Sequence, residues 1–338
     1  MNIIENISLK KYNSFGIAVN ASFFTEVATK EDLKEALRFA ANKNFPSLVL
    51  GGGSNVLFTK NYPGLVIKNN LPGIEVVKED ENHIYINVGA GVTWHHFVLY
   101  CINNNYAGVE NLALIPGSAG ASPMQNIGAY GVEIKEVFVE LNALHKFNLT
   151  EQQFNTAACE FGYRESVFKN KYKDQFIITD VTYRLNKKPH FNIEYGAIRQ
   201  QLEKDNVTDV SIQAIANAVI SIRSSKLPDP QKIGNAGSFF KNPSVPKNVF
   251  DELKQQFPDI AAYNNPDGTV KLAAGWLIEQ CGYKGFRKGD AGVHNKQALV
   301  LVNYGTANGN DILQLCHEIK SSVFKKFGIV IMPEVNIV

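Results

Sequence analysis

The chain has 338 residues, of which 45% are hydrophobic and 20% charged, as is typical of a globular protein of two or three domains. Lysine and arginine number 34 against 32 aspartates and glutamates, and the net charge of +2 argues against a whole-protein field that attracts nucleic acid or anionic membranes. No apolar run approaches the roughly 20 residues of a membrane span and no signal peptide is visible, so we expect a cytoplasmic protein.

Strand and helix signals alternate through the first third of the chain. Thr29 followed by Asp32 has the spacing of a helix capping box, and the apolar residues after it recur at helical period. Short β-branched or apolar runs bounded by glycine and asparagine indicate strands. The elements expected here are a helix around residues 33–40, strands at 47–50, 65–68 and 84–88, and a helix at 93–103.

Three more helices and a last strand are expected further along. The first helix, over residues 212–222, is followed by Pro228 and Pro230, which forbid continued helix and mark the best candidate for a domain boundary near Arg223. The other elements expected are a helix at 272–280 stopped by Gly282, a helix at 312–323 ending at Gly328, and a strand at 329–332. The coarse class is α+β, with an antiparallel or mixed sheet in the middle third.

Standard nucleotide-binding and metal-binding patterns are absent from the sequence. No P-loop pattern occurs, and the nearest G-x-G-x-x-G candidate, beginning at Gly89, has Trp94 at the third glycine position. The 4 cysteines are widely spaced, without a C-x-x-C pair or a Cys/His cluster, so we expect neither a metal site nor a disulfide framework. These absences argue against an ordinary Rossmann dehydrogenase or P-loop enzyme.

Two glycine-rich segments remain as candidates for ligand binding. Residues 51–55, Gly-Gly-Gly-Ser-Asn, follow a strand directly, and their backbone N–H groups can converge on an anion. Residues 115–131 combine small side chains with Gln125 and Asn126 and almost no charge, which suits backbone lying against a large flat ligand. Each segment also has a plainer interpretation, a tight turn for the first and a buried glycine loop for the second.

The longer segment carries a resemblance to a known family. Residues 115–131 read Ile-Pro-Gly-Ser-Ala-Gly-Ala-Ser-Pro-Met-Gln-Asn-Ile-Gly-Ala-Tyr-Gly. This run resembles the flavin-binding segment of the UDP-N-acetylenolpyruvoylglucosamine reductases, the MurB family. Other matches to the family follow in the same order over nearly the whole chain. They are Gly51–Leu57, Phe161–Ser166, Lys226–Pro230, Gly234–Pro243, Ala273–Ile278 and Pro333–Val335.

The resemblance implies a fold and a domain organisation. The fold is α+β, with an FAD-binding domain of the vanillyl-alcohol-oxidase (PCMH) type in two lobes, followed by a smaller α+β substrate-binding domain. On this chain the lobes correspond to residues 1–70 and 71–222, and the substrate-binding domain to 223–338, with its C-terminal strand returning to the active site. Such a fold holds the FAD diphosphate on glycine-rich loops, which accounts for the missing Rossmann fingerprint.

The resemblance also implies an activity, that of an NADPH-dependent flavoprotein oxidoreductase in peptidoglycan synthesis, and hence in cell-wall biogenesis, cell shape and cell division. NADPH would reduce FAD and leave, and the enolpyruvyl ether of UDP-N-acetylglucosamine would then be reduced to UDP-N-acetylmuramate. Hydride addition to the terminal enol carbon leaves a carbanion whose charge spreads into the adjacent carboxylate. Such an intermediate needs cationic or hydrogen-bonding partners and a proton donor close by.

Three residues take catalytic roles by this resemblance. Ser238, in Gly-Ser-Phe-Phe, would donate the proton, and Arg164, in Phe-Gly-Tyr-Arg, would hold the substrate carboxylate with its planar guanidinium. Glu334 would be protonated or paired with Arg164, because an ionised carboxylate beside a developing dianion is unfavourable. Without the family context these residues would be a turn hydroxyl, an ion-paired arginine and an exposed terminal carboxylate.

The resemblance carries over two sets of binding residues. The set for the UDP-sugar contains the tyrosine of a mobile loop that closes over substrate in one subtype, and residues for the phosphates, sugar and uridine. Its members are Tyr195, Lys226, Asn242, Tyr263, Lys284 and Gln297. The set for FAD is Gly51, Gly53, Ser54, Asn55, Gly117, Ser122, Gln125, Asn126, Gly128 and Tyr130. His294 and Lys296 receive no role.

The sequence departs from the family pattern at two positions. Asn336 stands where a basic residue is expected, which puts one cofactor or phosphate contact in doubt. Met124 replaces a more usual β-branched residue, a tolerable change of volume.

Two other functions stay open at this stage. A flavin oxidase of the same fold often carries a histidine or cysteine bonded to flavin, and residues 115–131 contain neither, although His95 and His96 lie earlier. A nucleotide-sugar-binding module without flavin would purify colourless. For the reductase we expect a monomer whose partners are the UDP-sugar and NADPH, and neither nucleic acid nor membrane.

Overall fold

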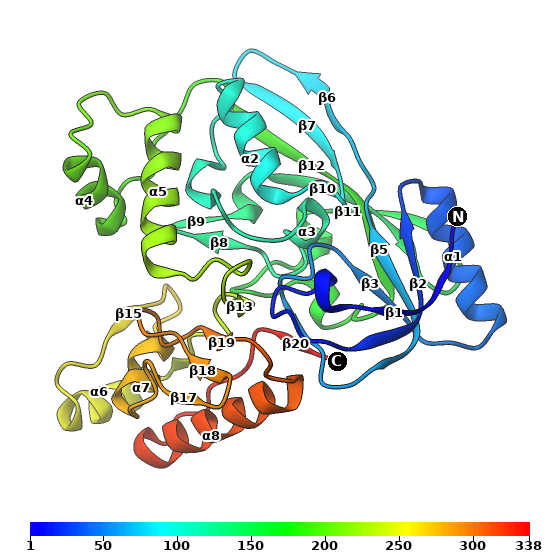
Figure 1. Cartoon of the computed structure of the whole chain (residues 1–338). Coiled ribbons are helices and arrows are strands. Elements are labelled where there is room, and N and C mark those ends of the chain that lie inside the picture. Colours follow the sequence, from blue (N-terminus) through cyan, green and yellow to red (C-terminus); the bar gives the residue numbers. More distant parts are fainter. The chain divides into compact units, whose positions relative to one another are not determined.

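The computed structural model describes all residues from Met1 to Val338 and shows two compact units. Both units combine helices and strands, which confirms the α+β class (Figure 1). No helix has the length and apolar content needed to cross a membrane. Unit 1 comprises Met1–Ile7, Ala21–Gly52 and Tyr62–Ser225, and unit 2 comprises Ser8–Asn20, Gly53–Asn61 and Lys226–Val338.

A small sheet in unit 1 carries the strand that leads to the first glycine-rich segment. Its strand order is β1 (Ile4–Ser8), β2 (Asn20–Val27), β5 (Tyr62–Asn69) and β3 (Ser47–Leu50), with β5 parallel to both β2 and β3. Helix α1 (Lys30–Asn42) begins at Thr29, whose hydroxyl accepts a hydrogen bond from the Asp32 backbone N–H at 3.0 Å, as the capping pattern predicts. Its apolar face packs on β2 and β5 (Figure 1).

A larger antiparallel sheet forms the rest of unit 1. Its order is β11 (Glu151–Asn155), β10 (Phe138–His145), β12 (Phe176–Asn186), β7 (His83–Gly89) and β6 (Ile74–Glu79). The helices of this part are α2 (Trp94–Asn103), α3 (Thr156–Cys159), α4 (Gly196–Lys204) and α5 (Ile212–Lys226). The apolar faces of α2 and α5 join one continuous core with β7 and β12. The antiparallel pairing of β10 with both β11 and β12 confirms the character expected for the middle third.

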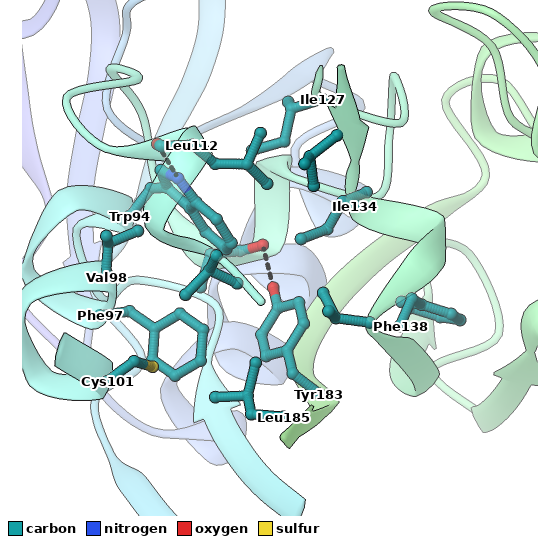
Figure 2. Packing of buried hydrophobic residues seen from close by; sticks show 14 of the residues in the cluster. Trp94, Phe97, Val98, Cys101, Leu112, Ile127, Ile134, Phe138, Tyr183 and Leu185 are labelled. Carbon is teal, nitrogen blue, oxygen red and sulfur yellow. Dashed lines mark hydrogen bonds between the residues drawn. The ribbon is translucent and has the colours of Figure 1, made fainter. Parts of the chain in front are cut away.

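Aromatic packing in this core reaches residues 115–131 directly. Trp94 donates from its indole to the Leu112 carbonyl at 2.9 Å, and the fully buried Tyr183 ring stacks on Phe97 with ring centroids 4.9 Å apart (Figure 2). The Tyr183 hydroxyl lies 2.8 Å from the Ser122 hydroxyl and 3.2 Å from the Ala119 carbonyl. Since a buried tyrosine hydroxyl needs such partners, Tyr183 fixes the glycine-rich segment to the sheet.

Unit 2 contains two small sheets and a long C-terminal helix. The first sheet has the order β13 (Gly234–Asn235), β19 (Leu301–Asn303), β18 (Ala291–Val293) and β17 (Arg287–Lys288). The second has the order β14 (Ser244–Val245), β16 (Val270–Leu272) and β15 (Ala262–Asn264), and β20 (Asn336–Ile337) pairs in parallel with β4 (Val56–Leu57). The helices are α6 (Lys247–Gln256), α7 (Ala274–Gln280) and α8 (Gly309–Phe327). Helix α8 ends at Gly328, which has φ +68°, as its sequence predicts.

Two predicted helix boundaries and one predicted strand were wrong, each for an identifiable reason. Helix α5 continues through Arg223 to Lys226, because a proline restricts only the residue directly before it, here Leu227. Helix α7 begins two residues late, because Leu272 pairs with Ala262 in a sheet. Residues 329–332 alternate between buried and exposed as a strand would, but they form no strand, since the only pairing nearby is an isolated bridge between Phe240 and Pro333.

Candidate flavin and substrate sites

The two glycine-rich segments of unit 1 touch each other through their backbones. A Cβ atom at position 52 would lie 2.9 Å from the Cα of Gly117, and one at position 51 would collide with the Ser118 hydroxyl. Gly117 also has φ +114°, a conformation that L side chains rarely adopt. Glycine is therefore required at position 52 by the close backbone and favoured at 117 by its φ, whereas at position 51 the Ser118 hydroxyl would have to rotate away.

The same contact gathers backbone donors that the protein leaves open. The N–H groups of Gly51, Gly52, Gly117 and Ser118 form no hydrogen bond with any other part of the chain. Several open N–H groups in adjoining glycine backbone form a concave anion site. We call the backbone of Gly51, Gly52, Gly117 and Ser118 the glycine cradle. It offers N–H donors and no carboxylate, and a single Cβ would fill it, so it fits the diphosphate of FAD.

The rest of residues 115–131 is held in place by its own side chains. The amide of the fully buried Asn126 donates to Glu133 and to the Gly162 carbonyl, both at 3.0 Å, and accepts from the Lys135 N–H at 3.1 Å. The Ser122 hydroxyl is likewise engaged with Tyr183. These two side chains, carried over as FAD contacts, therefore hold the segment itself, and a contact with FAD from them would come from backbone atoms.

Arg164 lies directly against this segment. Its guanidinium donates to the Gly128 carbonyl at 2.5 Å and to the Asn126 carbonyl at 3.3 Å, and it lies over the Tyr163 ring. The residue has φ +56°, a left-handed conformation within a tight turn between Gly162 and Glu165. The turn thus places a cation beside the backbone of the proposed flavin segment.

Arg223 is a second cation at this segment, and it was not among the residues predicted from the sequence. It donates from Nε to the Leu114 carbonyl at 3.2 Å and hydrogen-bonds the Tyr130 hydroxyl. Burial lowers the pKa of Arg223, and nearby Arg164 lowers it further, while Tyr130 opposes the shift. Arg223 forms no ion pair, so an anionic ligand would stabilise it. The sequence signal that could have identified Arg223 is its position four residues after Val219, which continues the apolar face of α5.

His95 supports the same point of the chain. Its Nδ1 accepts a hydrogen bond from the Leu114 N–H at 3.1 Å, and Leu114 has φ +57°. Burial lowers the pKa of His95, with a smaller contribution from Arg223. His95 therefore fixes the backbone immediately before residues 115–131.

The segment that bears Tyr195 is docked on the turn at Tyr130. The two rings meet edge to face with centroids 5.4 Å apart, and the Asn192 amide donates to the Gly131 carbonyl at 3.2 Å. The buried Asn111 amide donates to the Tyr130 carbonyl at 3.1 Å and the Asn192 carbonyl at 2.8 Å. One asparagine thus joins the flavin segment to the segment of the predicted substrate tyrosine, whose ring is 47% exposed.

In unit 2 the structure brings Ser238 and Glu334 together. Ser238 is exposed on a turn after Gly237, which has φ +68°, and Phe239 and Phe240 behind it are buried. The Glu334 N–H donates to the Phe239 carbonyl at 2.8 Å, so the half-buried Glu334 lies on the chain next to the serine turn. The buried phenylalanines hold the turn in place, and the exposed serine hydroxyl is accessible to a ligand.

The residues of unit 2 that were predicted to contact FAD lie beside the C-terminal segment. A Cβ at Gly53 would collide with the Tyr12 carbonyl, and Gly53 has φ +63°. The Asn55 amide donates to the Glu334 carbonyl at 3.4 Å, and the Asn55 carbonyl accepts from the Asn336 side chain at 3.0 Å. Asn336, where a basic residue was expected, thus supports the backbone at Asn55.

Two of the predicted UDP-sugar residues meet at the start of α7. Asn242 accepts from the Ala274 N–H at 3.0 Å, and a Cβ at Gly275 would lie 3.2 Å from the Gln297 side-chain oxygen. Of the other four, Tyr195 belongs to unit 1, and three lie elsewhere on the surface of unit 2. They are Lys226 at the end of α5, Tyr263 on β15, and Lys284, which is paired with Glu279 at 2.9 Å.

Comparison with known proteins gives these sites a family. A family model described as the C-terminal domain of UDP-N-acetylenolpyruvoylglucosamine reductase matches residues 229–338, and an FAD-binding-domain model matches 21–145. The UDP-N-acetylenolpyruvoylglucosamine reductase of Flavobacterium johnsoniae is 51% identical, with 100% of both chains covered. The chain belongs to this family. The reductases of Amoebophilus asiaticus and Pseudomonas putida are 48% and 46% identical, over 100% and 98% of both chains.

Solved structures agree on the fold. The chain resembles the MurB crystal structure from Thermus caldophilus with a TM-score of 0.70 and 24% identity, covering 100% of this chain and 99% of that one. A 6-hydroxy-D-nicotine oxidase from Arthrobacter nicotinovorans matches with a TM-score of 0.53 and 11% identity, over 97% and 86% of the chains. The predicted PCMH-type FAD-binding fold with a MurB C-terminal domain is confirmed.

Proposed function

We propose that this chain uses NADPH and FAD to reduce the enolpyruvyl ether of UDP-N-acetylglucosamine to UDP-N-acetylmuramate, a step of peptidoglycan precursor synthesis. The observation that carries the proposal is the meeting of Gly51–Gly52 with Gly117–Ser118, with open N–H groups, in a chain of this family. FAD supplies hydride transfer from NADPH to the enol double bond. The residues of the chain bind and orient the cofactor and the substrate, and they supply the proton.

The flavin-binding role rests on backbone groups. In unit 1, open N–H groups at Gly51 and Gly117 support a diphosphate site. In unit 2, Gly53 has φ +63°, a conformation that favours glycine. The remaining FAD residues of the proposal are Ser54, Asn55, Ser122, Gln125, Asn126, Gly128 and Tyr130. The residues present therefore fit the cofactor that the family implies.

Three side chains act on the reacting part of the substrate in this proposal. Arg164 holds the carboxylate that receives charge, since its planar fork matches a carboxylate. Ser238 gives a proton to the carbanion, and its exposure without an internal hydrogen bond supports that role. The Glu334 N–H bonds to the Phe239 carbonyl beside Ser238, and in this proposal the Glu334 carboxyl is protonated or paired with Arg164. Arg223 adds a second positive charge along the flavin segment.

The domain organisation of the proposal has three parts. The FAD-binding lobes are residues 1–70 and 71–222, and the substrate-binding domain is 223–338. The family match at 229–338 and the start of unit 2's last segment at Lys226 support the final boundary. We further propose that the enzyme acts as a cytoplasmic monomer on small molecules alone.

Sequential mixing tests the proposed function. The purified protein is expected to be yellow, to lose its colour when mixed anaerobically with NADPH, and to regain it when the enolpyruvyl UDP-sugar is added. A colourless protein that binds UDP-sugars would show a binding module instead. Recovery of colour only with oxygen, after reduction by a sugar or alcohol, would show an oxidase.

Lys226→Ala tests the UDP-sugar site. Lys226 is exposed, and removing a phosphate-binding ammonium is expected to raise the KM for the UDP-sugar about tenfold with little change in kcat. The matched control is Lys232→Ala, an exposed lysine in the same stretch, which should leave KM unchanged. Steady-state kinetics at fixed NADPH measures both. An unchanged KM in Lys226→Ala would remove this residue from the site.

A further inference from the structure

Lys68 is a half-buried cation that forms no ion pair, and it lies close to the backbone of Gly51, Gly52, Gly117 and Ser118, the glycine cradle. It lies near the end of β5, where it pairs with Leu50, the last residue of β3. Its Nζ donates to the Gly51 carbonyl at 2.7 Å, and it forms no ion pair. Burial lowers the pKa of Lys68, and Glu26, its register partner on β2, opposes this shift. A half-buried ammonium in contact with a single carbonyl is costly unless the surroundings gain from its charge.

The bond to Gly51 fixes the direction of a neighbouring donor. The Gly51 carbonyl and the Gly52 N–H belong to one planar trans peptide and point in opposite directions. A peptide between two glycines turns over easily, because neither residue has a Cβ to restrict it. The Lys68 ammonium, bonded to the Gly51 carbonyl, prevents this rotation of the peptide plane. It leaves the Gly52 N–H facing away from Lys68.

We propose that Lys68 is a positioning residue for the cofactor diphosphate, which it serves by locking the Gly51–Gly52 peptide so that the Gly52 N–H faces the anion. This inference rests on the proposed function, since it takes the cradle of Gly51, Gly52, Gly117 and Ser118 as the diphosphate site. The ammonium also adds positive charge next to that site. The chemistry recognised is a diphosphate joined to a flavin.

The chain offers a closely matched control lysine. Lys146, which directly follows β10, is also half-buried, and burial also lowers its pKa. Its Nζ donates to the Ser47 carbonyl at 2.7 Å, at the opposite end of β3 from Gly51. The two lysines therefore donate to backbone carbonyls at opposite ends of β3, but only Lys68 is bonded to a glycine of the cradle.

The test compares Lys68→Met, Lys68→Arg and Lys146→Met with the natural protein. Each purified holoenzyme is diluted in series and free FAD is read by its fluorescence, which gives the FAD dissociation constant. Riboflavin, which lacks phosphates, is measured by competition. Lys68→Met is expected to weaken FAD binding about tenfold, as for loss of a charge-assisted hydrogen bond, and to change riboflavin binding less than twofold. Lys68→Arg keeps a donor and should recover most of the affinity.

The outcomes separate this inference from the proposed function. Equal FAD affinity in Lys68→Met and the natural protein would overturn the role of Lys68, and so would equal losses for FAD and riboflavin. An FAD loss in Lys146→Met as large as in Lys68→Met would show a general effect of strand β3. A natural protein that binds no FAD at all would instead overturn the proposed function. If Lys68→Met does not fold, the Lys68→Gln variant repeats the comparison with a shorter neutral donor.

Discussion

Ser238→Ala is expected to lower the rate of reduction of the enolpyruvyl ether by about 10²–10⁴-fold, the range for loss of a general acid, while FAD reduction by NADPH keeps its rate. The fold should not change. Phe239 bonds to the Leu299 carbonyl and Glu334 to the Phe239 carbonyl through backbone alone, and the Ser238 hydroxyl is exposed without an internal hydrogen bond. The substitution therefore removes a proton donor and little else.

Stopped-flow measurement of the two half-reactions separates proton donation from other roles. Ser238→Cys supplies a thiol that can still donate a proton, and it should retain more activity than the alanine variant. Ser244→Ala, on β14 and also exposed, is the matched control and should behave as the natural protein. Equal losses in both half-reactions of Ser238→Ala would show that Ser238 does not protonate the substrate.

Arg164→Met is expected to lower kcat/KM for the UDP-sugar by about 10²–10³-fold, the cost of removing a donor that stabilises developing charge. The loss should appear in both kcat and KM, because the guanidinium would bind the carboxylate and then meet the added charge. The kcat/KM of Arg164→Lys should lie between those of the natural protein and Arg164→Met, since a lysine keeps the charge but not the planar fork. Steady-state kinetics over a range of UDP-sugar concentrations gives both constants.

The hydrogen bonds of Arg164 to the Gly128 and Asn126 carbonyls require a control on cofactor binding. FAD content and the rate of reduction by NADPH are therefore measured in the same variants. Arg199→Met removes an exposed arginine that pairs only with Glu194 on the surface, and it should leave all constants unchanged. If Arg164→Met lost FAD but retained full kcat/KM when FAD is added back, Arg164 would be only a support of the flavin segment.

Local sequence signals were sufficient where neighbouring residues decide the structure. The Thr29 cap, the αL residue Gly328 and the strand at 47–50 leading into glycine were all predicted, because caps, periodicity and glycine act over a few residues. Residues 115–131 carried the resemblance to the family, and with it the prediction of a flavin-binding segment. Its contact with Gly51–Gly52 had no such local signal.

The amino-acid sequence by itself determined the α+β class, the family and the identity of the residues offered for catalysis. Only the tertiary structure decided that Asn126 holds its own loop, that Arg223 and Lys68 bond to the Leu114 and Gly51 carbonyls, and that Leu272 joins a sheet. The physical reason is range. A cap or a helical stripe depends on residues within one or two turns. Which lysine contacts a given backbone carbonyl depends instead on how distant parts of the chain pack.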